Sequence, residues 1–190
     1  MSNKVLFFDT ETTGFVRKTL PYNDPKQARV CQLAAMLCDD TGAELNRMNV
    51  IIKPAGWYIP DIVANIHGIT TERAEREGIP VKEALTKFSE MSNVATIYVA
   101  HNFRFDNDMM NIEAFNEPSF VWRPTIEYCT MLTATPVCQI PATRGSGYKW
   151  PKLQEIYGHL FGEAFDNAHD AFADMIAMKR VYFELKKRGY

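Results

Sequence analysis

The sequence has no strong net charge, no long apolar run and no targeting segment, so its overall composition is that of an ordinary globular domain. Its 190 residues carry a formal net charge of only −2, so no strong global field indicates a nucleic-acid or membrane partner. No uninterrupted apolar run approaches the roughly 18 residues of a membrane span. The first residues also lack the pattern of a signal or transit peptide. These absences predict a cytoplasmic protein that does not bind membranes.

Cysteine is sparse as well, and linker-like segments are missing. The four cysteines form no CxxC pair, and a chain of this length needs no disulfide to be stable. We therefore expect reduced thiols at Cys31, Cys38, Cys129 and Cys138. There is no internal repeat or low-complexity tract, and the length predicts one domain over residues 1–190.

The order of the predicted elements favours an α/β protein. Strand-like runs come first, at 5–8, 30–38 and 45–52, and the last two flank a good turn signal at 39–42. Strands at 96–100 and 125–128 then alternate with helices at 59–68, 80–91, 102–117, 151–161 and 170–187, and a further helix starts at 70. We expect loops at 17–29 and 135–150. This order predicts a mixed sheet covered by helices.

The first strand runs directly into two carboxylates. Its faces are both apolar, which is typical of a central strand in a covered sheet. Asp9 and Glu11 are two residues apart, so they point to the same side, roughly 6.6 Å apart along the strand. At 4 Å such charges repel by about 4 kcal/mol for an effective dielectric near 20, unless a cation lies between them. A solvated strand end followed by a Thr-Thr-Gly turn is the alternative, and this segment alone favours a metal only modestly.

Two more acids lie on apolar helix faces. Asp106 falls in the first turn of a predicted helix, where an acid commonly compensates the helix dipole, but it shares a face with Phe103 and two methionines. Asp174 interrupts the apolar face of the last helix, and lone acids on such faces are rare unless paired or bound to a metal. His169 lies just before that helix, where it would lean over the same site. For a histidine taken singly, a structural role is the commoner one.

Taken in order, these acids resemble the DEDDh 3′–5′ exonucleases, the DnaQ-like superfamily that includes bacterial polymerase epsilon proofreading subunits. The resemblance rests on FDTETTG at 8–14, HNFRFD at 101–106 and HDAFAD at 169–174, with IHGIT at 66–70 as a further family-like element. Each motif is weak alone, but all of them in order, over nearly the whole chain, are strong. The resemblance implies a ribonuclease H-like fold: a mixed central sheet of about five strands, the first three antiparallel and the others parallel, flanked by helices.

The resemblance also implies a chemistry. Asp9 would bridge two divalent ions, Glu11 and Asp174 would complete the first, and Asp106 would support the second. Ligands that are all oxygen suit Mg²⁺ or Mn²⁺ and argue against zinc. His169, with an ordinary pKa of about 6.5, would be the general base for the attacking water.

Candidate substrate contacts surround these motifs. They are Thr12, Thr13, Gly14, Phe15, His67, Asn102 and Phe103. The threonines and the glycine offer hydroxyls and close backbone approach, or simply a turn. The two phenylalanines would stack on terminal bases, although packing is the commoner role for each. A phosphate track or a solvated basic face would account for Arg17, Lys18, Arg144, Lys149 and Lys152.

The sequence therefore predicts a two-metal-ion 3′–5′ exonuclease that releases nucleoside monophosphates from single-stranded or frayed DNA ends. The same chemistry on RNA is the nearest alternative, because the motifs do not read the sugar. Gln32 stands where proofreading subunits often carry an acid, and Phe103 where a small residue is usual, which leaves the substrate preference open. A non-catalytic subunit of a polymerase or replisome, and an endonucleolytic ribonuclease H relative, are further alternatives. The complete set of acids opposes the former, and His169 with the Asp-x-Glu start opposes the latter.

Overall fold

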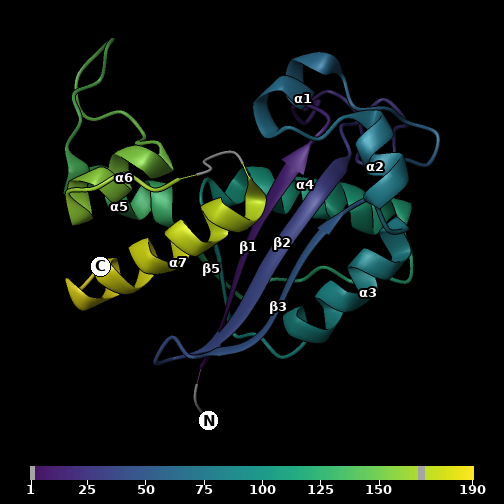
Figure 1. Ribbon diagram of the computed structural model, residues 1–190. Coiled ribbons are helices and arrows are strands. Elements are labelled where there is room, and N and C mark those ends of the chain that lie inside the picture. Colours follow the sequence, from purple (N-terminus) through teal and green to yellow (C-terminus); the bar gives the residue numbers. More distant parts are fainter. Residues whose placement is uncertain (1–2, 167–169) are drawn as a thin grey trace.

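A five-stranded sheet forms the centre of the protein in the computed structural model, which describes residues 3–166 and 170–190 (Figure 1). The strands are β1 (Lys4–Thr12), β2 (Val30–Asp39), β3 (Glu44–Ile51), β4 (Ile97–Ala100) and β5 (Ile126–Cys129), in the order β3-β2-β1-β4-β5. β1, β2 and β3 pair antiparallel, whereas β4 and β5 run parallel to β1. The prediction of a mixed ribonuclease H-like sheet is confirmed.

Seven helices complete the described part of the chain. They are α1 (Asp61–His67), α2 (Thr71–Glu77), α3 (Val81–Ser92), α4 (Phe103–Asn116), α5 (Thr130–Cys138), α6 (Leu153–Phe161) and α7 (Ala171–Lys187). None of these described helices has both the length and the apolar character needed to cross a membrane.

The prediction of a loop at 135–150 was wrong at its start, because residues 135–138 belong to α5. A proline inside a helix removes a hydrogen bond and clashes with the preceding turn, which is why Pro136 favoured a loop. Pro136 lies in the last turn of α5, where its missing N–H leaves the carbonyl of Leu132 without a helical donor. The helix buries Met131, Ala134 and Cys138 on one face, and this tertiary packing outweighs the local preference.

Successive side chains of β1 pack on opposite faces of the sheet, as strand geometry requires. Phe7 lies edge-on against Tyr182 of α7, with ring centroids 5.3 Å apart. Phe8 packs against Phe88 of α3 and Phe103 of α4, at 5.9 and 5.7 Å. α7 therefore covers one face, and α3 and α4 cover the other; in Figure 1, α7 crosses in front of the strands and α4 lies behind them.

A buried ion pair joins the start of β2 to α4. Glu113 is only 1% exposed and accepts hydrogen bonds from Arg29 Nε at 2.9 Å, from Arg29 Nη2 at 2.6 Å and from the Val30 amide at 3.0 Å. Such two-pronged, charge-assisted contacts fix orientation as well as distance. The pair holds the end of the 17–29 loop against the helix that follows β4.

We expect Glu113→Ala to lower the free energy of unfolding by about 3 kcal/mol, because it leaves the partly buried Arg29 guanidinium without its partner. Glu83→Ala is the matched control. Glu83 is also helical, but its pair with Lys87 is about half exposed, so this loss should stay below about 1 kcal/mol. Urea unfolding followed by circular dichroism measures both values. Equal losses of unfolding free energy in the two variants would show that the buried Arg29–Glu113 pair stabilises the fold no more than the exposed Glu83–Lys87 pair does.

Candidate active site

The alternation of β1 sends its acids and Thr10 to opposite sides of the sheet. Asp9 and Glu11 face α7, as Phe7 does, whereas Thr10 points toward α4. α7 carries Asp174 in its first turn. The end of the central strand thus delivers two carboxylates to the helix that holds a third.

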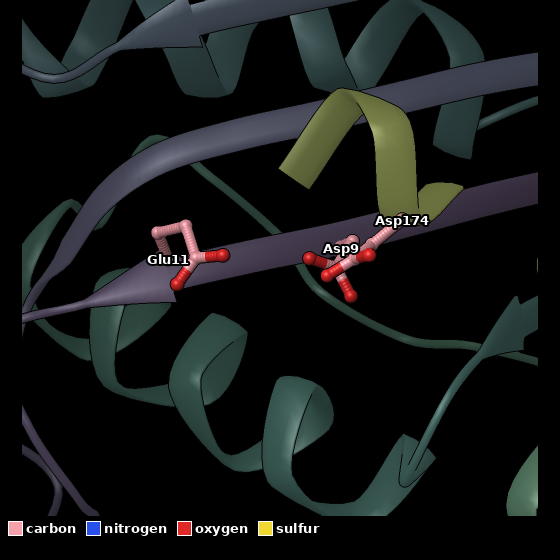
Figure 2. Close-up of side chains that lie close together, drawn as sticks. All are labelled: Asp9, Glu11 and Asp174. Carbon is pink, nitrogen blue, oxygen red and sulfur yellow. The ribbon is translucent and has the colours of Figure 1, made fainter. Parts of the chain in front are cut away.

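These three carboxylates form one cluster. Each of Asp9, Glu11 and Asp174 offers an oxygen, and the three oxygens all lie within 4.8 Å of one another. In Figure 2, Asp9 and Glu11 rise from β1 on the same side, and Asp174 reaches toward Asp9 from the start of α7. Their juxtaposition is the one that the sequence predicted.

The N-terminus of α7, which positions Asp174, is fixed by Asp170. Its Oδ1 accepts hydrogen bonds from the amides of Phe172 and Ala173, at 3.1 and 3.0 Å, so Asp170 is the N-cap of this helix. Gln32 lies opposite Glu11 in the β1–β2 register. The Gln32 amide donates to Asp170 Oδ2 at 3.3 Å, which ties the helix cap to the sheet.

Asp106 approaches the cluster from the α4 side. It is 2% exposed, and its Oδ1 accepts hydrogen bonds from the Thr10 amide at 3.1 Å and from the Thr10 hydroxyl at 2.7 Å. Its charge raises the pKa of Asp9, so the two carboxylates are close enough to interact. The sequence identified Asp106 but missed Thr10, because nothing local shows which helix a strand residue will meet.

Burial and mutual repulsion raise the pKa values of these acids. Burial is the largest cause for Glu11, followed by the charges of Asp174 and Asp106, and together they raise the pKa of Glu11 to about 8. Burial also raises the pKa of Asp106 to about 7, against the opposing hydrogen bonds from Thr10. The pKa of Asp9 rises well above its ordinary range, first through burial and then through Asp106 and Asp174. A divalent cation in place of the bound protons would relieve this repulsion.

The turn after β1 engages the hydroxyls that were predicted to contact substrate. The Thr12 hydroxyl donates to the Gly14 carbonyl at 2.8 Å, and the Thr13 hydroxyl accepts from the Arg29 amide at 2.9 Å. Gly14 has a φ of 151°, a backbone conformation that favours glycine. Phe15 follows with 86% of its surface exposed. The turn is therefore preformed, with an exposed aromatic ring at its end.

The remaining predicted substrate contacts, at His67, Asn102 and Phe103, differ in how far they are exposed to solvent. His67 Nδ1 accepts from the Ile69 amide at 3.2 Å, and burial lowers the pKa of its imidazole. Asn102 is exposed and left-handed, with a φ of 61°, directly before α4. Phe103 is only 3% exposed against Phe8, which favours the packing role over base stacking. The predicted general base, His169, lies outside the described residues.

The basic residues that were predicted to form a phosphate track also differ in their surroundings. Arg17, Lys18 and Arg144 are exposed, whereas Lys149 forms an ion pair with Glu155 at 2.5 Å. Lys149 is therefore partly neutralised within the fold.

The comparison with protein families decides the assignment. A family model described as Exonuclease, RNase_T, matches residues 6–182. The chain belongs to this exonuclease family. Its acids identify it as a DEDDh, or DnaQ-like, member, as the sequence motifs indicated. No curated protein matches the chain.

Solved structures of exonuclease I share the fold. The enzyme from Methylocaldum szegediense is 22% identical to this chain, with a TM-score of 0.75. The match covers 98% of this chain and 41% of the exonuclease I chain. E. coli exonuclease I in complex with a dA16 oligonucleotide is 21% identical with a TM-score of 0.76, again over 98% and 41%. A zinc-bound E. coli exonuclease I–ssDNA complex gives the same identity, TM-score and coverage. The chain thus spans about two-fifths of the length of these proteins.

The acidic cluster is a candidate site for a divalent metal ion. Its donors are carboxylate oxygens at Asp9, Glu11 and Asp174, a hard ligand set that suits Mg²⁺ and also Mn²⁺. Raised pKa values at two of these donors agree with a site built to hold positive charge.

We expect Mg²⁺ to stabilise the protein more at about pH 8.5 than at about pH 5. Without metal, folded Glu11 holds its proton up to about pH 8, whereas unfolded Glu11 releases it near 4.5. The folded state therefore binds more protons between these values, and stability falls as pH rises through that window. Millimolar Mg²⁺ should reverse this fall, as measured by the melting temperature at each pH.

Asp174→Asn should remove most of this Mg²⁺-dependent rise in melting temperature, whereas Asp40→Asn, at an exposed turn acid, should keep it. An equal Mg²⁺ effect in wild type and Asp174→Asn would contradict the assignment of the site.

Proposed function

We propose that this protein is a metal-dependent 3′–5′ exonuclease that releases nucleoside monophosphates from single-stranded or frayed DNA ends. The observation that carries the proposal is the cluster of Asp9, Glu11 and Asp174 at the end of β1, in a chain of an exonuclease family. The complexes of exonuclease I with dA16 and dT13 oligonucleotides support DNA rather than RNA. We also propose that residues 1–190 act as one exonuclease domain.

In this proposal Asp9, Glu11 and Asp174 would hold one divalent ion, and Asp9 and Asp106 would support a second. When bound, the ions would stabilise the negative charge that develops on the phosphate oxygens. His169 takes the proton from the attacking water. The water oxygen bonds to phosphorus as the bond between phosphorus and the 3′ oxygen of the preceding nucleotide breaks, and this 3′ oxygen takes a proton from solvent to become a hydroxyl. The two hydrogen bonds from Thr10 keep the Asp106 carboxylate oriented throughout.

Digestion of matched DNA and RNA oligonucleotides tests this function and its alternatives. With Mg²⁺ present, we expect mononucleotides from DNA with a free 3′ end, and no release when the 3′ end is blocked. A 5′ block should have no effect. Equal or faster digestion of RNA would favour an exoribonuclease. A complete lack of hydrolysis with Mg²⁺ and Mn²⁺ would favour a binding subunit of a polymerase or replisome.

We expect Asp9→Ala and Asp174→Asn each to lower kcat by at least about 10³, because loss of a metal ligand removes several kcal/mol of transition-state stabilisation. The fold should survive, since removing one acid relieves repulsion among the others. Single-turnover digestion measures the rate, and far-ultraviolet circular dichroism checks the fold. Asp40→Asn, at an exposed position, is the control. Wild-type rates in either site variant would refute the metal assignment.

The dependence of rate on pH should reveal the general base. We expect kcat to rise with pH, to reach half its maximum at about pH 6.5, where half of His169 has lost its proton, and to level off above about pH 7.5. His169→Ala should lose this rising limb and about 10²–10⁴ in rate. A profile that the substitution leaves unchanged would remove His169 from the mechanism.

A further inference from the structure

A cleft of about 330 Å³ opens beside the turn that follows β1. Thr13 to Phe15 form one side, the 17–29 loop forms another, and the segment 56–60 closes it. Thr13 is only two residues beyond Glu11, which is about 7 Å of extended chain. The cleft therefore lies next to the acidic cluster without including it.

The charge of this cleft is opposite to that of the acidic cluster. Arg17, Lys26 and Arg29 line it, and no acidic residue does so in the described part of the chain. Arg29 is held by Glu113, but neither Arg17 nor Lys26 forms an ion pair with any described residue. Two exposed cations without acidic partners, in a chain of net charge −2, suit an anionic ligand.

Aromatic rings lie among these cations. Phe15 is 86% exposed and Tyr58 is 70% exposed, and both line the cleft. Trp57 lies between the cleft and the core, with the Arg29 guanidinium 5.9 Å from its ring centre. Exposed rings beside free cations are the combination that binds single-stranded nucleic acid, since bases stack on rings and phosphates meet the cations.

The loop wall of the cleft is internally braced. Gln27 is 5% exposed, and its side chain accepts from the Arg17 amide at 2.9 Å and donates to the carbonyls of Arg17 and Leu20, each at 3.1 Å. The Tyr22 hydroxyl donates to Asp108 of α4 at 2.6 Å, which anchors the middle of the loop. A preformed wall loses little conformational entropy when a ligand binds.

We propose that this cleft binds an unpaired nucleotide of the substrate strand, other than the one released, with its base against Tyr58 and its phosphate at Arg17 and Lys26. The proposal rests on the proposed exonuclease function and specifies its substrate. A base paired in a duplex cannot lie flat on Tyr58, so the cleft would favour single strands.

Binding of fluorescein-labelled oligothymidylate, measured by anisotropy in an Asp174→Asn background that prevents hydrolysis, tests the cleft. Tyr58→Ala should weaken binding about 5-fold or more, the loss of one stacked base. Lys26→Ala should reduce the salt dependence of log affinity by about 0.7, the loss of one phosphate contact. Lys187→Ala, at the exposed end of α7, and Tyr190→Ala, three residues beyond it and also exposed, are matched controls and should leave both values unchanged.

Affinity for blunt duplex DNA should be the same in Tyr58→Ala as in its parent. Unchanged oligothymidylate binding in both cleft variants would overturn the proposal, whatever the hydrolytic activity. A weakening that is equal for duplex and single strand would also overturn it. Absence of hydrolysis by the wild-type protein would instead refute the proposed function, so the two failures are distinguishable.

Discussion

Repulsion among carboxylates at the end of β1 is the constraint on which the rest of the structure depends. Asp9, Glu11 and Asp174 are held with oxygens within 4.8 Å, a separation that their charges oppose in a poorly solvated place. Only a rigid frame keeps such groups together. β1 supplies it, because residues 5–8 are buried on both faces between α7 and the pair α3 and α4. The burial of apolar side chains in the core therefore offsets the free energy that the repulsion among these carboxylates costs.

The parts of the fold that follow from local chemistry could be predicted from the sequence. An apolar run that ends in Asp9 and Glu11 specifies a buried strand, and alternation puts both acids on one side. The face of α7 that carries Asp174 follows from helical periodicity.

Phe15 and Phe103 look alike in sequence, yet one is exposed and the other lies in the core. Only the packing of Phe103 against Phe8 separates them, and that contact joins residues far apart in the chain.

Longer-range and irregular features could not be predicted. α5 runs through Pro136, which argues for a loop until the burial of its apolar face is known. The 17–29 loop has no periodic pattern, yet Gln27 organises it through hydrogen bonds to backbone groups. Side-chain amides that replace regular backbone pairing leave no repeat in the sequence. The cleft beside the site, which this loop builds, could therefore not be predicted from the sequence, although one of its cations, Arg17, was identified there.

The shortness of β4 has a consequence for how the fourth acid is held. β4 pairs with β1 only as far as Phe7, and the chain then turns through Asn102 into α4. The Thr10 amide, which a longer neighbour would have engaged in the sheet, is left to bind Asp106 instead. A backbone amide that has no partner in the sheet thus binds the carboxylate of Asp106. Lengthening β4 by two or three residues would pair this amide within the sheet. The carboxylate of Asp106 would then be displaced, although no acidic residue had been substituted.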